Sequence, residues 1–204
     1  MPTSVPTSDP ELIKIVVPDA GPLNTFAAAG MLHLLLAPEN CRLVLVDEIE
    51  REIVSRETEL ATFITDNKAR IDVVETATGR GAEALRALGQ TPGRNVGELA
   101  IVEFVMYQVD EVLGNSPALV IYEDKKLPRL HLVQDAFAKR AHIITTAAYL
   151  RKLATDGIID DFSATWATIV RANESQTKNL HRVPSPEERE LPATAGSRIR
   201  FKRP

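Results

Sequence analysis

The sequence predicts a three-layer α/β/α sandwich, in which helices cover both faces of a central parallel sheet of four to five strands. Three observations lead to this fold class. Strand-like and helix-like segments alternate along the chain, and four of the strand segments are near-continuous apolar runs, as in sheets buried on both faces. The 204 residues are 44% hydrophobic and 25% charged, which is typical of a globular protein and excludes collagen-like, disulfide-scaffold and wholly disordered chains.

Five segments are expected to form the strands. They lie at 12–17, 42–46, 71–74, 118–122 and 142–144. The first is rich in β-branched residues and is ended by Pro18. The second and fourth are almost entirely apolar, and the third is short.

The segments between and after these strands carry helical signals. Helices are expected at 21–36, 47–54, 60–69, 82–88, 96–109, 130–139, 146–155 and 159–172. Asp47 can cap the helix that follows the second strand. The segment 96–109 repeats apolar residues at helical spacing, and Gly157 separates the last two helices.

Charge and composition divide the chain into an N-terminal arm (1–12), one α/β domain (13–174) and a basic tail (175–204) that is expected to be flexible. The tail carries seven basic and three acidic residues, whereas the whole chain has a net charge of −4. A basic tail on a net negative body can act as an arm for nucleic acid, with Arg200 and Lys202 among its contacts. Anchoring of the tail on a partner subunit through Ile199 and Phe201 is the alternative.

The compartment is indicated by what the sequence lacks. The lone Cys41 excludes an intramolecular disulfide and zinc sites built on paired cysteines, which fits a reducing environment. The N-terminus has no secretory signal, and the longest apolar runs fall far short of the ~20 residues that span a bilayer. We therefore expect a cytoplasmic protein without membrane partners.

Acidic and hydroxyl side chains follow several expected strands, at the edge where ligands bind in open parallel sheets. The set is Asp19, Glu52, Glu98, Glu123, Asp124 and Thr146. Converging carboxylates repel one another and stay ionised together only when cations compensate them. Oxygen ligands favour Mg²⁺ or Mn²⁺, so the pattern predicts a metal site suited to phosphate-ester hydrolysis. The structural alternative is that each acid caps a helix or is solvated.

Five segments between residues 13 and 172 together resemble one protein family. They read VVPDAGPLNTFAAAGMLHLL, LVDEIEREI, NVGELAIVEF, LVIYEDKKL and HIITTAAYLRKLATDGII. They are similar, in this order, to the motifs of the PIN-domain nucleases, a family that includes toxins of bacterial toxin–antitoxin pairs. The resemblance implies a flavodoxin-like fold and a metal-dependent endoribonuclease activity.

The resemblance also implies roles for individual residues. Asp19, Glu98 and Asp124 would bind the Mg²⁺ or Mn²⁺ ion. Glu52 would complete the catalytic set of four acids or orient the attacking water. Thr146 matches the threonine that follows the last strand in the family.

Two further residues adjoin the matched acids, and the sequence departs from the family pattern at one place. Asn95 and Glu123 are expected to support the site, although the adjacency of Glu123 and Asp124 leaves the fourth acid ambiguous. Many members carry Ser or Thr just after the first Asp, whereas Ala20 and Gly21 stand here. This departure removes one hydroxyl from the expected surroundings of the metal.

The leading expectation is a hydrolase that cleaves RNA phosphodiester bonds, with Arg80 and Arg94 neutralising substrate phosphates. One alternative is a catalytically inactive PIN-like binding module, favoured by the missing hydroxyl after Asp19. The other is a different metal-dependent phosphate hydrolase on a similar sheet. An antitoxin protein and a second copy of the chain, forming a homodimer, are left open as further partners.

Overall fold

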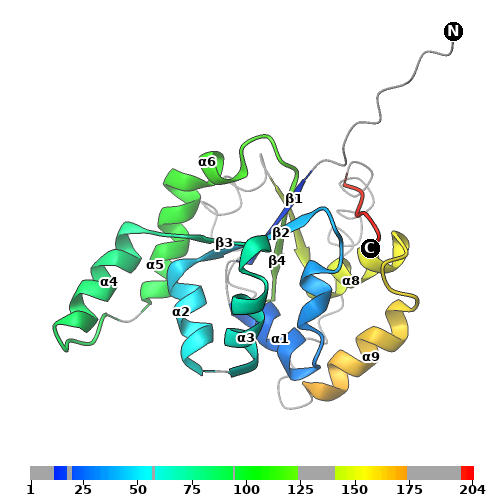
Figure 1. Ribbon diagram of the computed structural model, residues 1–204, viewed down its shortest axis with the longest axis horizontal. Helices are drawn as coiled ribbons and strands as arrows, with labels where there is room; N and C mark the ends of the chain where they lie inside the picture. The colour runs from blue at the N-terminus through cyan, green and yellow to red at the C-terminus, as the bar shows by residue number, and fades with distance from the viewer. Residues whose placement is uncertain (1–11, 18–19, 57, 94, 124–140, 174–198) are drawn as a thin grey trace, which may run out of the picture.

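A parallel sheet forms the centre of the computed structural model, which describes residues 12–17, 20–56, 58–93, 95–123, 141–173 and 199–204 (Figure 1). Its strands are β1 (Ile13–Val17), β2 (Cys41–Val46), β3 (Ile71–Val74), β4 (Ala118–Tyr122) and β5 (Ala141–Thr145). They lie in the order β3-β2-β1-β4-β5, and every neighbouring pair is parallel.

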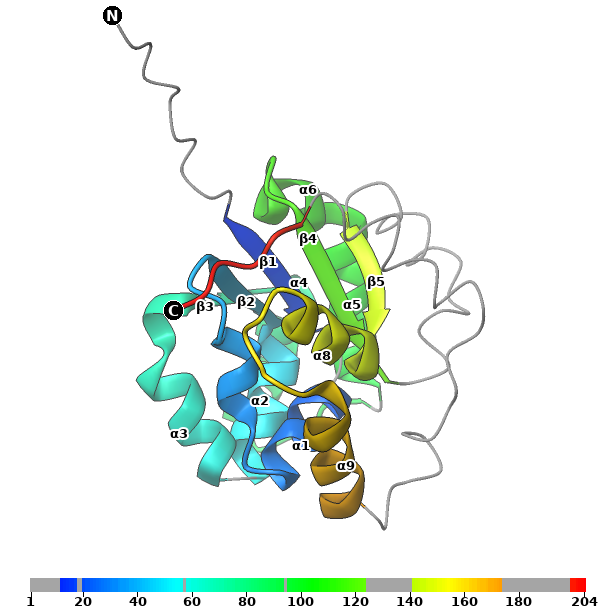
Figure 2. The same cartoon turned by 90° about the vertical axis from the view of Figure 1, so that its right-hand side faces the viewer.

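Helices cover both faces of this sheet, which confirms the predicted three-layer fold. They are α1 (Gly21–Ala28), η1 (Leu32–Leu36), α2 (Asp47–Arg56), α3 (Thr58–Asp66), η2 (Lys68–Arg70), α4 (Ala77–Ala87), α5 (Val96–Glu103), η3 (Phe104–Gln108), α6 (Val109–Leu113), α8 (Thr146–Thr155) and α9 (Phe162–Ala172). The helices α1, α8 and α9 lie on one face, and α5 and α6 on the other (Figures 1 and 2). Within the described ranges, no helix has the length and apolar character needed to cross a bilayer.

The core lies on both sides of the two central strands. All residues of β4 are buried, and in β1 only Lys14 is partly exposed. On the α1 face, the ring of Tyr149 packs edge to face on Phe26, with 6.3 Å between the centroids. Each fully buried large apolar side chain contributes about 1.5–3 kcal/mol, so this double-sided burial is the main source of stability.

Two helices differ from their predicted spans because of local backbone geometry. The expected helix 21–36 divides into α1 and η1, since Gly30 adopts a left-handed φ of 65°. Its N–H donates to Ala27 O, and the Met31 N–H donates to Phe26 O, which together close α1 with a Schellman motif. The expected helix 96–109 is interrupted by η3, a π-helical turn. The expected helix 130–139 lies outside the described residues.

Two carboxylates explain why α4 begins earlier than the predicted span 82–88. Asp47, the first residue of α2, accepts hydrogen bonds from the Thr76 N–H (2.8 Å) and hydroxyl (3.0 Å). Glu103 of α5 accepts from the Thr78 N–H at 2.8 Å. Both acids satisfy N–H groups at the start of a helix, and the absence of a side chain at Gly79 lets Asp47 approach.

The last six residues, 199–204, pack on the domain, so the expectation of a flexible tail is wrong for them. Ile199 and Phe201 are buried in the core of the chain itself rather than on a partner subunit. The Phe201 N–H donates to Asp156 (2.9 Å), and the Lys202 N–H donates to Asn40 (2.8 Å). Figure 2 shows this C-terminal segment in red, running past the amino ends of the central strands. The remainder of the tail, up to residue 198, lies outside the described residues.

Candidate functional site

The strand order points to one location for a ligand site. The chain proceeds from β1 to β2 and β3 on one side, and then returns to β4 and β5 on the other. Right-handed crossovers therefore place the helices after β1 and β3 on opposite faces of the sheet. Ligands of open α/β sheets bind outside the carboxyl ends of the strands at such a switch point, which here lies between β1 and β4.

A hydrogen-bonded carboxyl group occupies the carboxyl end of β4. Glu123 directly follows this strand, and its Oε2 accepts a hydrogen bond from the Thr25 hydroxyl at 2.8 Å. Its Oε1 accepts from the Thr146 hydroxyl at 2.6 Å. Both threonines are only 1% exposed, so the two oxygens of Glu123 are held from opposite ends by fixed partners. We call these three residues the Glu123 cluster.

Three different elements bring the Glu123 cluster together. Thr25 lies on α1, which follows β1, and Thr146 is the first residue of α8, which follows β5. The Thr145 hydroxyl accepts from the Ala148 N–H at 3.2 Å and so caps α8. This cap fixes the first turn of α8 at the end of β5, where the Thr146 hydroxyl reaches the neighbouring strand end.

The surroundings of Glu123 set its protonation. Burial raises the pKa of Glu123, because the charged carboxylate loses hydration there. The hydrogen bonds from Thr146 and Thr25 act in the opposite direction, because they stabilise the ionised form. A cation beside this carboxyl would further favour the charged form. The carboxyl is thus oriented but poorly hydrated.

Asn173 links the last helix to this cluster. It follows α9, is only 2% exposed, and donates through Nδ2 to Thr25 O (3.1 Å) and Ile169 O (2.9 Å). Its Oδ1 is buried and accepts no hydrogen bond from any residue that the structure describes. The amide thereby fixes the backbone of α1 at the same residue whose hydroxyl holds Glu123.

The structure brings together two of the residues predicted from sequence, Thr146 and Glu123. Asp19 and Asp124 lie outside the described residues, so the predicted trio of metal ligands is represented only by Glu98. No group of three or more His, Cys, Asp or Glu side chains able to hold a metal ion occurs within the described part. The expected magnesium or manganese site therefore stays a prediction.

Two predicted acids, Glu52 and Glu98, lie on neighbouring helices. Glu52 is half-buried on α2, whereas Glu98 is exposed in the first turn of α5. The helices approach closely where a Cβ on Gly97 would lie 3.4 Å from Ile49 Cδ1. Asn95, just before α5, adopts a left-handed φ of 66° and starts the helix without a side-chain capping bond.

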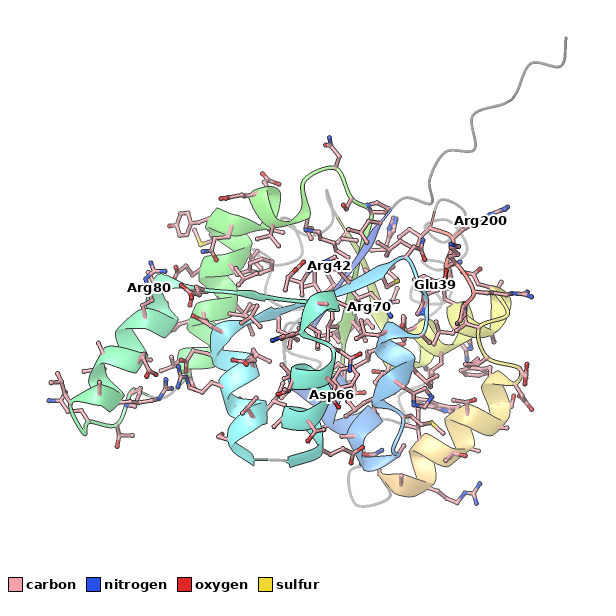
Figure 3. The ribbon with its side chains drawn as sticks, viewed as in Figure 1. Glu39, Arg42, Asp66, Arg70, Arg80 and Arg200 are labelled. Carbon is pink, nitrogen blue, oxygen red and sulfur yellow. The ribbon has the colours of Figure 1, made fainter. Side chains whose placement is uncertain are left out.

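The basic residues expected to bind nucleic acid do not form one surface. Arg80 is exposed near the start of α4, while Arg200 lies at the other side of the molecule, near Glu39 (Figure 3). Lys202 pairs with Glu39 at 3.0 Å. Glu39 is next to Asn40, which directly precedes the amino end of β2. Arg200 and Lys202 thus lie at the opposite ends of the strands from Glu123. Arg94 lies outside the described residues.

Sequence reasoning missed Thr25 and Asn173. Thr25 lies six positions after Asp19 among the buried residues Leu23 and Phe26, where a polar residue is unusual. This contrast was the available signal for Thr25. Asn173 directly follows a helix, a position where asparagine is common, and nothing in its spacing indicates a partner on α1.

The Glu123 cluster can hold a carboxyl group in one orientation at a ligand-binding edge. Such a group can bind a cation, orient a water molecule or accept a proton. Comparison with known proteins adds no family to this geometry, because no family model and no curated protein matches the chain.

Proposed function

We propose that this protein is a Mg²⁺- or Mn²⁺-dependent hydrolase that cleaves RNA phosphodiester bonds. The observation that carries the proposal is the position of Glu123: a half-buried carboxyl, held by two hydroxyls, at the switch point of a parallel sheet. Open α/β sheets bind their ligands at this location. The resemblance of the sequence motifs to PIN-domain nucleases supports the choice of reaction and substrate.

The chemistry of the donors fits a hard divalent cation. The cluster offers carboxylate and hydroxyl oxygens, which Mg²⁺ and Mn²⁺ prefer over sulfur and nitrogen ligands. In sequence, Asp19 comes two residues after β1 and Asp124 two residues after β4, and these strands are neighbours in the sheet. We therefore propose Asp19 and Asp124 as metal ligands, together with Glu98, which matches the third acid of the family motif. Glu123 adjoins Asp124 in the sequence.

The chain's own residues would divide the work as follows. Thr25 and Thr146 orient Glu123, and Glu123 with Glu52 orients the water that attacks the phosphorus. The bound ion would polarise the phosphate and lower the pKa of that water. Arg80 and Arg94 would offset part of the phosphate charge.

Incubation with a generic single-stranded RNA tests this proposal. We expect cleavage with Mg²⁺ or Mn²⁺, none after chelation, and none by Asp19→Asn, which removes a charge and keeps the shape. Glu59→Gln is the matched control, because Glu59 is exposed on α3. Cleavage by Asp19→Asn at the wild-type rate would refute the assignment. Parallel assays with DNA and with phosphomonoesters separate a ribonuclease from another phosphate hydrolase.

A non-catalytic binding module is the second candidate. The observation that favours it is that each oxygen of Glu123 already accepts a hydrogen bond from a threonine hydroxyl. This arrangement also suits a purely structural carboxyl. RNA binding without cleavage in any divalent cation would select this candidate. A toxin role, an antitoxin partner and a homodimer are finer proposals that rest on the family resemblance. Size-exclusion chromatography tests the homodimer, and identification of the neighbouring gene's product tests the toxin role and the antitoxin partner.

A further inference from the structure

We infer that Thr25 is a positioning residue for Glu123, and that Asn173 holds Thr25 in place for this role. The inference rests on the proposed function, because it assigns to these residues the orientation of a carboxyl at the proposed site. Neither residue was expected from the sequence motifs. Both are buried polar residues that are distant from Glu123 along the chain, Thr25 on α1 and Asn173 directly after α9.

The hydroxyl of Thr25 donates to a distant carboxylate, as those of Thr78 and Thr146 do, and not to a carbonyl oxygen of its own helix. The hydroxyls of Thr65, Thr155, Thr165 and Thr168 donate to the carbonyl oxygen four residues earlier, within their own helices. The single hydroxyl proton of Thr25 is directed to Glu123, 98 positions away. A carbonyl oxygen of its own helix would have satisfied this hydroxyl without linking α1 to another part of the fold. The long-range bond therefore fixes the carboxyl of Glu123 rather than the helix α1.

Holding both oxygens matters for a carboxyl that acts on a ligand. A glutamate side chain has three rotatable bonds, and a hydrogen bond to one oxygen still permits rotation about the last of them. Thr146 holds Oε1 and Thr25 holds Oε2, from opposite sides of the switch point. With both bonds in place, the plane of the carboxyl is set before any ligand binds.

Asn173 completes this support by fixing the helix that carries Thr25. Thr25 O is one of the last four carbonyls of α1, which have no partner within the helix. It accepts from Asn173 Nδ2, whereas Phe26 O and Ala27 O accept from the turn after α1. Among the described residues, nothing donates to the buried Asn173 Oδ1. A buried acceptor without a donor is costly, so the value of this amide lies in the two bonds that it donates.

The test compares Thr25→Val, which keeps the shape and removes the hydroxyl, with Thr25→Ser, which restores it. Thr65→Val is the matched control, because its hydroxyl is exposed and bonds locally. For RNA cleavage, we expect Thr25→Val to lower kcat by about 10- to 100-fold with little change in KM. Thr25→Ser should recover most of kcat, and Thr65→Val should behave as the wild type. Asn173→Ala should lower kcat in the same direction.

A crystal structure of Thr25→Val gives a readout that does not depend on activity. We expect the Glu123 carboxyl to have rotated away from its wild-type position, and to have returned in Thr25→Ser. An unchanged carboxyl position, or an unchanged kcat in an active protein, overturns the inference while leaving the proposed function intact. A wild-type protein that fails to cleave RNA overturns the proposed function, and the crystallographic comparison still decides whether Thr25 positions Glu123.

Discussion

Glu48 and Arg86 form a two-fold hydrogen-bonded ion pair that joins α2 to α4. Arg86 Nη1 lies 2.9 Å from Glu48 Oε1, and Nη2 lies 2.6 Å from Oε2. The Glu48 side chain is only 5% exposed, so the loss of its partner would leave a buried carboxylate largely unpaired. We expect Arg86→Ala to lower the free energy of unfolding by about 2–3 kcal/mol.

Chemical denaturation of Arg86→Ala measures this loss. Arg51→Ala is the control, because Arg51 also contacts Glu48, at 3.5 Å, but its side chain is 44% exposed. An exposed pair is worth at most about 1 kcal/mol. Equal losses for the two variants would contradict the special role of Arg86.

The same pair predicts a dependence of stability on pH. The hydrogen bonds from Arg86 lower the pKa of Glu48, although its burial opposes the shift. Because the pKa is lower in the folded state, ionised Glu48 stabilises the fold above the unfolded value of about 4.3. This contribution is lost as the pH falls through the lower folded pKa. The stability difference between the wild type and Glu48→Gln should therefore shrink in unfolding curves measured from neutral to acidic pH.

Two glycines of α4 provide a matched pair of variants. A Cβ at position 79 would overlap the carboxylate of Asp47, whereas a Cβ at position 81 would meet no atom of the described residues within 4 Å. Gly79→Ala should therefore destabilise the protein by about 1–3 kcal/mol. Gly81→Ala should stabilise it by about 0.5–1 kcal/mol, because alanine favours the helix. Thermal unfolding of both variants measures the two signs, and stabilisation by Gly79→Ala would contradict the close approach of Asp47.

The C-terminal segment is expected to contribute to stability. Phe201 is 6% exposed and packs edge to face on Tyr149, with 5.8 Å between the ring centroids. We expect Phe201→Ala to cost about 3 kcal/mol, and Arg200→Ala to cost little because Arg200 is exposed. A melting temperature that is unchanged in Phe201→Ala would show that the segment is not part of the cooperative fold.

Charge-removing variants can distinguish the roles of Glu123 and Asp124. The motif match favours Asp124 as the fourth acid, whereas the Glu123 cluster lies at the switch point. We expect Glu123→Gln to lower RNA cleavage by at least about 10-fold, because an amide changes the charge and one hydrogen-bonding site. Retained activity in Glu123→Gln, with loss in Asp124→Asn, would make Glu123 a structural residue and Asp124 the site acid.

The parallel sheet could be predicted because each strand is encoded locally. A run such as 118–122 is apolar throughout, and burial on both faces of the sheet requires this. The contacts of Thr25 could not be predicted in the same way, because Glu123 lies 98 positions away and no spacing links the two. Thr146 was named from the family motif, yet the sequence did not reveal the atom to which it donates.

The local sequence also did not predict other tertiary contacts. Asp47 was expected to cap the helix that it begins, and it additionally binds Thr76 at the start of α4. Ile199 and Phe201 were recognised as apolar anchors, but a sequence does not say which surface an anchor covers. The structure places both in the core of the same chain, beside Tyr149.

The placement of Phe201 also sets an order for biosynthesis. A ribosome adds residues 199–204 after the strands and helices of the domain, and these residues supply buried side chains to a core built mostly from much earlier ones. The nascent chain therefore cannot finish packing around Tyr149 until residues 199–204 have left the ribosome. Domains fold as they emerge, so this domain completes its core only after its last packed segment has emerged. Messages truncated before the codon for Ile199 should yield incompletely packed chains that proteases can remove.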